Sequence, residues 1–211
     1  MGEESSKSKS SFTKDTIISE DLSEEAAFLA DRLLSRVQLH GDKFPAGYQS
    51  FSELTRGCLK VHSIHPGKVS CILSVKSAIS VKYLGSDFHF CSIAVTFLLV
   101  GWACPHSNMT SVQPQNIYGS MHGGAVGAVA ETVSIACART VVGKDKKLFL
   151  GELRMSYLST AKSNAEVIVD GSIIKSGRST TVVATDFRLK DSKKLVYTSN
   201  ATFYHMPIAS L

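Results

Sequence analysis

The alternation of apolar and polar residues predicts an amphipathic helix near the start of the chain. Ser23 is expected to be its N-cap, with Glu24 and Glu25 in the first turn, where negative charge is favourable. The helix is expected to end near Gln38, before Gly41. Apolar residues recur at helical spacing at Leu22, Ala26, Leu29, Leu33 and Val37.

Two strands joined by a tight turn are expected next, after a connector over residues 44–54. Residues 57–64 alternate apolar and polar, and residues 68–75 place Val69, Cys71 and Leu73 on one face. The segment His65-Pro66-Gly67 lies between them. Its proline lacks a backbone N–H, and its glycine adopts turn conformations freely. This arrangement predicts a β-hairpin.

A second helix, rich in small apolar residues, is expected after His122, followed by a polar loop over residues 144–147. Four strands then follow, separated by turn residues at Ser163-Asn164, at Ser176-Gly177-Arg178 and at Asp191-Ser192. Their expected ranges are 148–157, 165–175, 180–190 and 194–204. The order of helix, two strands, helix and four strands predicts an α+β fold, in which one antiparallel sheet packs against a long helix.

One apolar block interrupts this pattern. Residues 88–104 contain no Lys, Arg, Asp or Glu, and their length of 17 residues lies at the lower edge of what spans a membrane. Three interpretations of the surrounding segment 81–113 remain open: an element packed on the domain, a membrane-facing element, or sequence foreign to the fold, such as a retained intron. The third is favoured because the pattern on either side is continuous when the segment is removed.

Length and composition limit the organisation of the chain. With 211 residues the chain is long enough for one core and short for two, so residues 21–211 are expected to form a single domain. Residues 1–20 are rich in Ser, Lys and Glu, which predicts a disordered tail. The net charge is +5, but the basic residues are scattered and lack interleaved aromatic residues. A nucleic-acid partner is therefore not expected.

The five cysteines bear on cofactors and on cellular location. Their odd number and the absence of a C-x-x-C spacing argue against a disulfide framework or a zinc site, and for a reducing compartment. We therefore expect a cytoplasmic location. The C-terminal Ala209-Ser210-Leu211 is a distant variant of a peroxisomal tripeptide, so the peroxisome is the alternative.

The chemistry of the chain is expected in residues 116–131. The sequence His122-Gly123-Gly124 brings unpaired backbone N–H groups to a helix N-terminus, where negative charge is favoured. Further along the same helix, the carboxylate of Glu131 stands among Ala and Val, where burial is costly without a partner or a function. A lone His or a Gly pair can be purely structural, and Glu131 can be a paired structural acid, but their combination indicates a reactive site.

These residues resemble the hotdog-fold thioesterases, specifically the PaaI-like acyl-CoA thioesterase family, over about residues 50–80 and 114–206. The likeness is carried by Gly119 to Gly124, by Glu131, by Leu153 to Ala161 and by Lys175 to Arg178. It implies a hotdog fold, in which an antiparallel sheet wraps around a long central helix. It also implies homodimers that often pair into homotetramers, and a coenzyme A thioester as substrate. For this reading we expect no metal and no redox cofactor. The N-terminal helix predicted above is expected as an addition to the hotdog fold.

The resemblance also implies roles for individual residues. Asn116 would orient the site, His122 and Gly123 would polarise the thioester carbonyl, and Glu131 would activate water or attack directly. Where the family commonly has a Ser or Thr that assists chemistry, this chain has Leu150. Residues expected to contact coenzyme A are Gly124, Lys175, Gly177, Arg178 and Ser179. Lys175 and Arg178 flank a turn, where exposed charge without a ligand is the common alternative.

The geometry of a helix constrains how such a site is built. Nine residues at about 1.5 Å each separate His122 from Glu131 by roughly 13 Å along a helix. One chain is therefore not expected to aim both residues at the same carbonyl, whereas two chains related by a two-fold axis could form two shared sites. Two other functions remain open: dehydration or hydration of an acyl thioester, and acyl-CoA binding by a catalytically impaired isoform.

Overall fold

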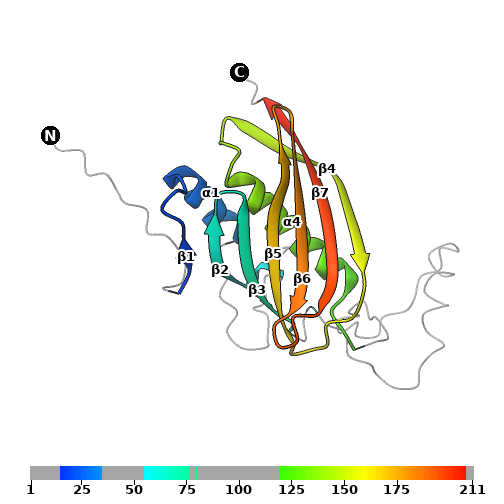
Figure 1. The fold of residues 1–211 in the computed structure, drawn as a ribbon. Helices are drawn as coiled ribbons and strands as arrows, with labels where there is room; N and C mark the ends of the chain where they lie inside the picture. The colour runs from blue at the N-terminus through cyan, green and yellow to red at the C-terminus, as the bar shows by residue number, and fades with distance from the viewer. Residues whose placement is uncertain (1–14, 35–54, 77–78, 80–118, 208–211) are drawn as a thin grey trace, which may run out of the picture.

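The computed structural model describes residues 15–34, 55–76, 79 and 119–207. In this part of the chain a seven-stranded sheet has the order β1-β2-β3-β5-β6-β7-β4, and a long helix, α4, crosses one of its faces (Figure 1). The elements are β1 (Ile17–Ile18), α1 (Glu24–Leu34), β2 (Leu59–His65), β3 (Lys68–Ser74), α4 (Gly123–Arg139), β4 (Lys146–Tyr157), β5 (Glu166–Ser176), β6 (Thr180–Leu189) and β7 (Leu195–Pro207).

The predicted order of elements is confirmed, with one addition at the N-terminal side. Residues 15–20 were expected in a disordered tail, but Ile17 and Ile18 form β1, which pairs in parallel with β2. The remaining strand pairs are antiparallel. The first helix begins as predicted, since the Ser23 hydroxyl accepts a hydrogen bond from the Ala26 N–H at 3.2 Å. It is described only to Leu34, so its predicted end near Gln38 lies outside the described residues.

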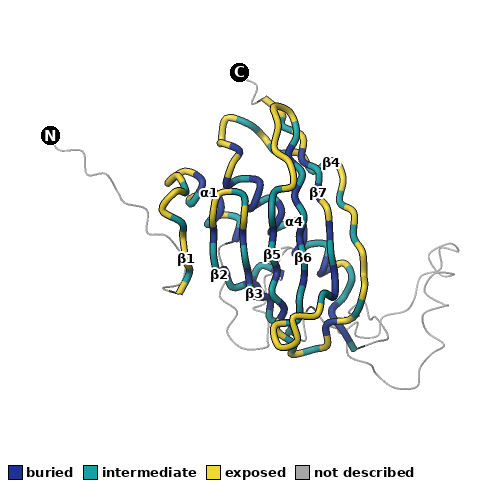
Figure 2. The backbone as a smooth tube through the Cα atoms, in the orientation of Figure 1, coloured by how far each residue is buried: buried dark blue, intermediate teal, exposed yellow. Residues whose placement is uncertain are grey.

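Helix α4 is the centre of the core because its small side chains allow it to lie close to the sheet. Val126, Val129 and Val133 are buried together with six other residues of the helix. A Cβ atom on Gly171 of β5 would lie 3.1 Å from Val133, so the glycine permits this approach. The buried hydroxyls of Ser134 and Thr185 are 2.9 Å apart and satisfy each other's hydrogen-bonding capacity between α4 and β6. Figure 2 shows this buried zone between helix and strands.

The predicted hairpin holds the C-terminal end of α4. β2 and β3 pair from His65 and Lys68 at the turn, where Gly67 has a φ of 74°. The Gly67 N–H donates to the Thr140 hydroxyl at 2.7 Å, and that hydroxyl donates to the Cys137 carbonyl at 2.6 Å. The turn and the helix end therefore satisfy each other's polar groups.

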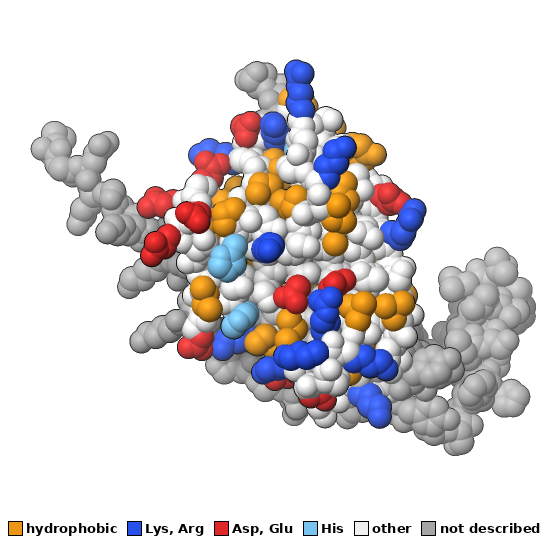
Figure 3. Space-filling model, viewed as in Figure 1, with side chains coloured by type: hydrophobic (Ala, Val, Ile, Leu, Met, Phe, Trp, Pro, Cys, Tyr) orange, Lys and Arg blue, Asp and Glu red, His pale blue; other side chains and the backbone are white. Residues whose placement is uncertain are grey.

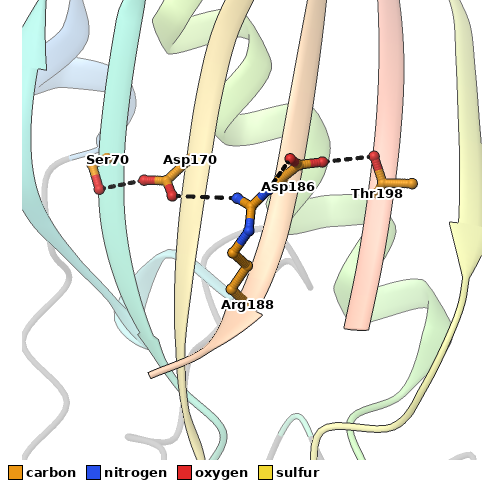
Figure 4. A network of polar contacts seen from close by, with 5 residues as sticks. All are labelled: Ser70, Asp170, Asp186, Arg188 and Thr198. Atoms are coloured by element: carbon orange, nitrogen blue, oxygen red, sulfur yellow. Dashed lines mark hydrogen bonds and ion pairs between the residues drawn. The ribbon is translucent and has the colours of Figure 1, made fainter. Parts of the chain in front are cut away.

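The opposite face of the sheet carries a network of charged side chains at its centre. Figure 3 shows this face, with hydrophobic side chains above and below a central group of acidic and basic ones. Asp170 of β5 and Asp186 of β6 are directly opposite in the strand register, and Arg188 contacts them at 3.8 and 2.6 Å (Figure 4). Hydroxyl groups of Ser70 and Thr198 donate to the two carboxylates at 2.6 and 2.8 Å. The network therefore links four adjacent strands.

Candidate active site

His122 is the N-cap of α4, so the predicted loop-to-helix junction is where the helix begins. Its backbone is extended, with φ −67° and ψ 134°, and its ring nitrogen Nδ1 accepts a hydrogen bond from the Gly124 N–H at 3.0 Å. A ring nitrogen that accepts cannot carry a proton in the neutral imidazole. This hydrogen bond therefore assigns the ring proton to Nε2.

At the start of a helix, the N–H groups of the N-cap and of the next three residues have no carbonyl partner four residues earlier within the helix. The Ala125 and Val126 N–H groups donate to the His122 carbonyl at 2.9 and 3.1 Å, and the Gly124 N–H donates to the imidazole. Among the described residues, none accepts a hydrogen bond from the Gly123 N–H. This N–H lies at the positive end of the dipole of a 17-residue helix, so a developing negative charge would be stabilised there.

The loop that enters the helix is held by two separate segments. The His122 N–H donates to the Ile79 carbonyl at 2.9 Å, and the Met121 N–H donates to the Ala161 carbonyl at 2.9 Å. Ser120 and Lys162 form an isolated antiparallel bridge beside the second contact. These contacts fix the direction in which the loop presents His122 and Gly123.

Tyr157, at the end of β4, contacts the start of α4 and was given no role by sequence reasoning. Its hydroxyl donates to the Gly123 carbonyl at 3.1 Å. Its ring packs edge-to-face on Tyr197, with 5.7 Å between centroids. The Tyr197 hydroxyl accepts from the Ala161 N–H at 2.9 Å, and burial raises the pKa of Tyr197. The available signal was the position of Tyr157 within the segment Leu153–Ala161, but strand alternation alone could not show its contact with Gly123.

Glu131 does not share the environment that the sequence predicts. Its apolar neighbours Val129, Ala130 and Val133 are buried, whereas Glu131 is exposed on α4. The expectation that its own chain buries this carboxylate is wrong, because burial follows the face of the helix and not the neighbours in sequence. Within one chain, Glu131 and the Gly123 N–H lie along the same helix and not around one point.

Of the predicted coenzyme A contacts, only Gly124 lies beside Gly123, at the start of α4. The other four are on or beside the β5–β6 turn, at the opposite end of the sheet. Strand β7 gives the distance between the two ends. Tyr157, beside Gly123, pairs with Tyr197 of β7, whereas Thr180, which follows the β5–β6 turn, pairs with Tyr204. Tyr197 and Tyr204 are seven residues apart, which is roughly 23 Å at about 3.3 Å per strand residue. Figure 1 shows the β5–β6 turn at one end of the sheet and the start of α4 at the other. One chain therefore does not bring Lys175, Gly177, Arg178 and Ser179 to its own Gly123.

His205 supports this β5–β6 turn and is a second residue that sequence reasoning missed. Its backbone N–H donates to the Ser179 carbonyl at 2.8 Å. Its Nδ1 is 3.2 Å from the Arg178 carbonyl, and its Nε2 is 2.9 Å from the Thr181 hydroxyl. A carbonyl only accepts, so Nδ1 donates to it and Nε2 accepts from Thr181. Lys175 and Arg178 are exposed beside this anchored turn.

The structure does not describe every predicted residue of the site. Asn116 and the segment 81–113 lie outside the described residues, so their roles remain predictions. Leu150 lies in β4 and packs against the core, which is where a leucine is stabilising. Among the described residues, no helix is both long enough and apolar enough to cross a membrane. The same part of the chain holds no group of three or more His, Cys, Asp or Glu placed to bind a metal ion.

Comparisons with known proteins agree with this architecture. The family model of the thioesterase superfamily matches residues 118–196. No curated protein sequence matches the chain significantly. Thioesterase superfamily member 2 from zebra fish superimposes with a TM-score of 0.52 at 18% identity, over 75% of this chain and 88% of its own. Thioesterase superfamily member 2 from Mus musculus gives 0.50 at 15% identity, over 76% and 98%. A thioesterase family protein from Silicibacter pomeroyi gives 0.50 at 14% identity, over 72% and 86%.

These matches confirm two expectations. The chain has the hotdog fold, with the sheet wrapped around α4, and the resemblance to hotdog thioesterases is confirmed by the match over residues 118–196, which begins just before the loop that carries His122. The family-model match supports thioester hydrolysis as the general activity.

Proposed function

We propose that this chain, which has the hotdog fold and matches the thioesterase superfamily, hydrolyses an acyl-CoA thioester to a free acid and coenzyme A. The observation that carries the proposal is the Gly123 N–H at the start of α4, which has no acceptor among the described residues. In thioester hydrolysis, negative charge develops on the carbonyl oxygen, and backbone donors fixed before the reaction stabilise it.

The proposed reaction has two steps. The thioester carbonyl oxygen accepts hydrogen bonds from the Gly123 N–H and the Nε2–H of His122. Glu131 takes a proton from a water molecule, the water oxygen bonds to the carbonyl carbon, and the oxyanion is held at the helix start. The intermediate then collapses: the bond from carbon to sulfur breaks, and the coenzyme A thiolate leaves with the proton from Glu131. Direct attack by Glu131, followed by hydrolysis of the anhydride, gives the same products.

We propose that the Glu131 of each site comes from the partner subunit. Glu131 is exposed on α4, about 12 Å along the helix from Gly123 at about 1.5 Å per residue. Gly124, Gly127 and Ala128 lie one and two turns before it on the same side, and a Cβ atom on Gly127 would meet nothing within 4 Å. This small-residue face allows another chain to approach closely. A partner's helix alongside it would bring a second Glu131 near Gly123.

The edge of the sheet gives the dimer its geometry. In the part of the chain that the structure describes, β4 is the last strand in the sheet order and pairs only with β7, which leaves the other side of this 12-residue strand without a described partner. Long unprotected edges favour pairing with another strand. Phe149, Tyr157 and Leu158 on and beside this edge are between 54 and 58% exposed, which fits an interface between two copies. Further pairing into a homotetramer remains a prediction from the resemblance.

The proposed two-fold arrangement also supports a role for the predicted coenzyme A contacts. Antiparallel pairing of two β4 strands places the Tyr157 end of one chain beside the Lys146 end of the other. The Lys146 end of the strand is also the end of the sheet that carries the β5–β6 turn. Lys146 pairs with Pro207 of β7, and Thr180, directly after the turn, pairs with the nearby Tyr204. The partner that supplies Glu131 would thus also supply Lys175, Gly177, Arg178 and Ser179 to the phosphates.

A panel of acyl-CoA thioesters with a thiol-reactive dye tests the proposal. Release of coenzyme A by the full chain, and loss of that release in Glu131→Gln with substrate binding retained, would support it. The matched control is Glu24→Gln, which makes the same change at an exposed acid of α1. Binding without thiol release would indicate an acyl-CoA-binding protein. Conversion of the acyl chain without thiol release would indicate a dehydratase or hydratase.

A further inference from the structure

One peptide unit at the start of α4 is held at both ends. The carbonyl of Gly123 accepts from the Tyr157 hydroxyl at 3.1 Å, and the N–H of Gly124 in the same peptide unit donates to Nδ1 of His122 at 3.0 Å. Tyr157 and His122 are far apart in sequence, yet a single amide connects their side chains.

The direction of these hydrogen bonds is uniform. The phenol proton of Tyr157 points to the carbonyl oxygen, and the amide proton of Gly124 points to the imidazole. Hydrogen bonds in series polarise one another, so a donor on the carbonyl strengthens the amide N–H as a donor. The stronger this N–H, the more His122 favours the tautomer that accepts at Nδ1 and carries its proton on Nε2.

The surroundings of Tyr157 keep its hydroxyl in place without burying it. Its ring packs on Tyr197, whose own hydroxyl is held by the Ala161 N–H. A Cβ atom on Gly123 would lie 3.5 Å from the Tyr157 oxygen, so the glycine leaves room for the phenol. Tyr157 is nevertheless 54% exposed in the single chain, so removing its hydroxyl leaves no buried void.

We propose that Tyr157 is a positioning residue that acts through the Gly123–Gly124 peptide to hold His122 with its proton on Nε2. In this tautomer the ring donates to the same carbonyl oxygen as the Gly123 N–H. This inference rests on the proposed thioester hydrolysis, but the tautomer of His122 can be measured without any substrate.

The test compares Tyr157→Phe with the unchanged chain, using protein labelled with ¹⁵N in its histidines. The His122 signals are identified by their loss in His122→Gln. In the unchanged chain, we expect the Nδ1 shift of an acceptor and the Nε2 shift of a protonated nitrogen. In Tyr157→Phe, both shifts should move toward the average of the two tautomers. Unchanged His122 shifts in this variant would overturn the proposal.

The matched control is Tyr204→Phe, which removes a hydroxyl with no partner among the described residues from a tyrosine of similar exposure, 49%. We expect no change of the His122 shifts there. If thiol release is observed, Tyr157→Phe should lower kcat about ten-fold, as for one lost hydrogen bond, and leave KM within about two-fold. Equal kcat in the Tyr157 and Tyr204 variants would contradict the role.

A double-mutant cycle separates a role through His122 from an independent one. In a His122→Gln background the Tyr157 hydroxyl has no imidazole to position, so adding Tyr157→Phe should lower kcat by less than about two-fold. A full ten-fold further loss would show that Tyr157 acts independently. If no acyl-CoA is hydrolysed at all, the hydrolase proposal fails, while the ¹⁵N comparison still decides whether Tyr157 positions His122.

Discussion

The N–H of Gly123 and the carboxylate of Glu131 belong to one helix, α4, and are eight residues apart: the N–H is at the helix start, and Glu131 is exposed further along. A reacting carbonyl held at Gly123 would be about 12 Å from the Glu131 backbone of its own chain. This relationship makes the oligomeric state part of the proposed chemistry.

Mixed dimers of two inactive chains should recover activity. In a dimer of Gly123→Pro with Glu131→Gln, one site combines the intact Gly123 N–H of one chain with the intact Glu131 of the other. Random mixing by coexpression should therefore give roughly a quarter of the activity of the unchanged protein, because half of the dimers are mixed and each has one complete site. Thiol release by the co-purified mixture, compared with each variant alone, measures this.

No recovery in the mixture, with each variant folded and dimeric by light scattering, would mean that both groups act within one chain. The shared site would then be wrong, although hydrolysis itself would not be excluded.

Replacing Gly123 by proline should remove the oxyanion donor while keeping the helix. Proline is tolerated at the first position of a helix, and the residue before it must be extended, as His122 already is with φ −67° and ψ 134°. We expect kcat/KM for acyl-CoA to fall about 10²- to 10³-fold with little change in the melting temperature. The control, Gly123→Ala, keeps the N–H and adds a Cβ at ordinary contact distance from Tyr157. Equal activity of the proline and alanine variants would contradict the assigned donor.

Replacing Arg188 by methionine should destabilise the sheet. Asp170 and Asp186 are directly opposite each other, and like charges in such a pair repel once the guanidinium between them is gone. We expect a loss of about 1–2 kcal/mol in the free energy of unfolding, measured in urea at a fixed protein concentration.

The control for this prediction is Arg154→Met, which breaks a single exposed ion pair with Glu152 at 3.4 Å and should cost less than about 0.5 kcal/mol. Adding Asp186→Asn to Arg188→Met should restore part of the loss. No restoration would show that repulsion is not the cause.

The buried thiol of Cys71 should make stability fall at alkaline pH. Burial, and secondarily the charge of Asp170, raises its pKa from 9.0 to about 12. Because the native state keeps the proton that the unfolded chain loses, this contribution is complete below pH 9 and declines as the pH rises from 9 towards 12. Between pH 9 and 12, the free energy of unfolding should fall less steeply with pH in Cys71→Ala than in the unchanged chain. The two slopes should differ by about 1.4 kcal/mol per pH unit.

Urea unfolding at pH 8, 9, 10 and 11 in reducing buffer measures the difference between the two proteins. Other groups that titrate in this range are common to both and cancel. Parallel curves above pH 9 would contradict the assigned environment of Cys71.

Much of the fold could be predicted because its signals are local. The hairpin at Gly67, the N-cap at Ser23 and the strand ranges follow from periodicity and turn residues within a few positions. β1 was missed because two residues carry no period, and their pairing with β2 depends on a contact 46 positions away, between Ile17 and Ser63.

The site divides in the same way. The start of α4 at His122 and Gly123 could be predicted because a helix N-terminus is determined by consecutive residues. The contact of Tyr157 with Gly123 spans 34 positions and depends on where β4 ends relative to α4, which no local pattern specifies.

By itself, the sequence determined the type and order of the elements after β1, the start of α4 and the separation of His122 from Glu131, because helical rise and strand alternation are properties of neighbouring residues. Only the tertiary structure decided that β4 lies at the edge, that the β5–β6 turn is roughly 23 Å from Gly123 at strand spacing, and that Glu131 is exposed on α4. These three features depend on which apolar faces of the helices and strands pack together. That packing maximises burial of apolar surface over the whole chain and not within a local segment.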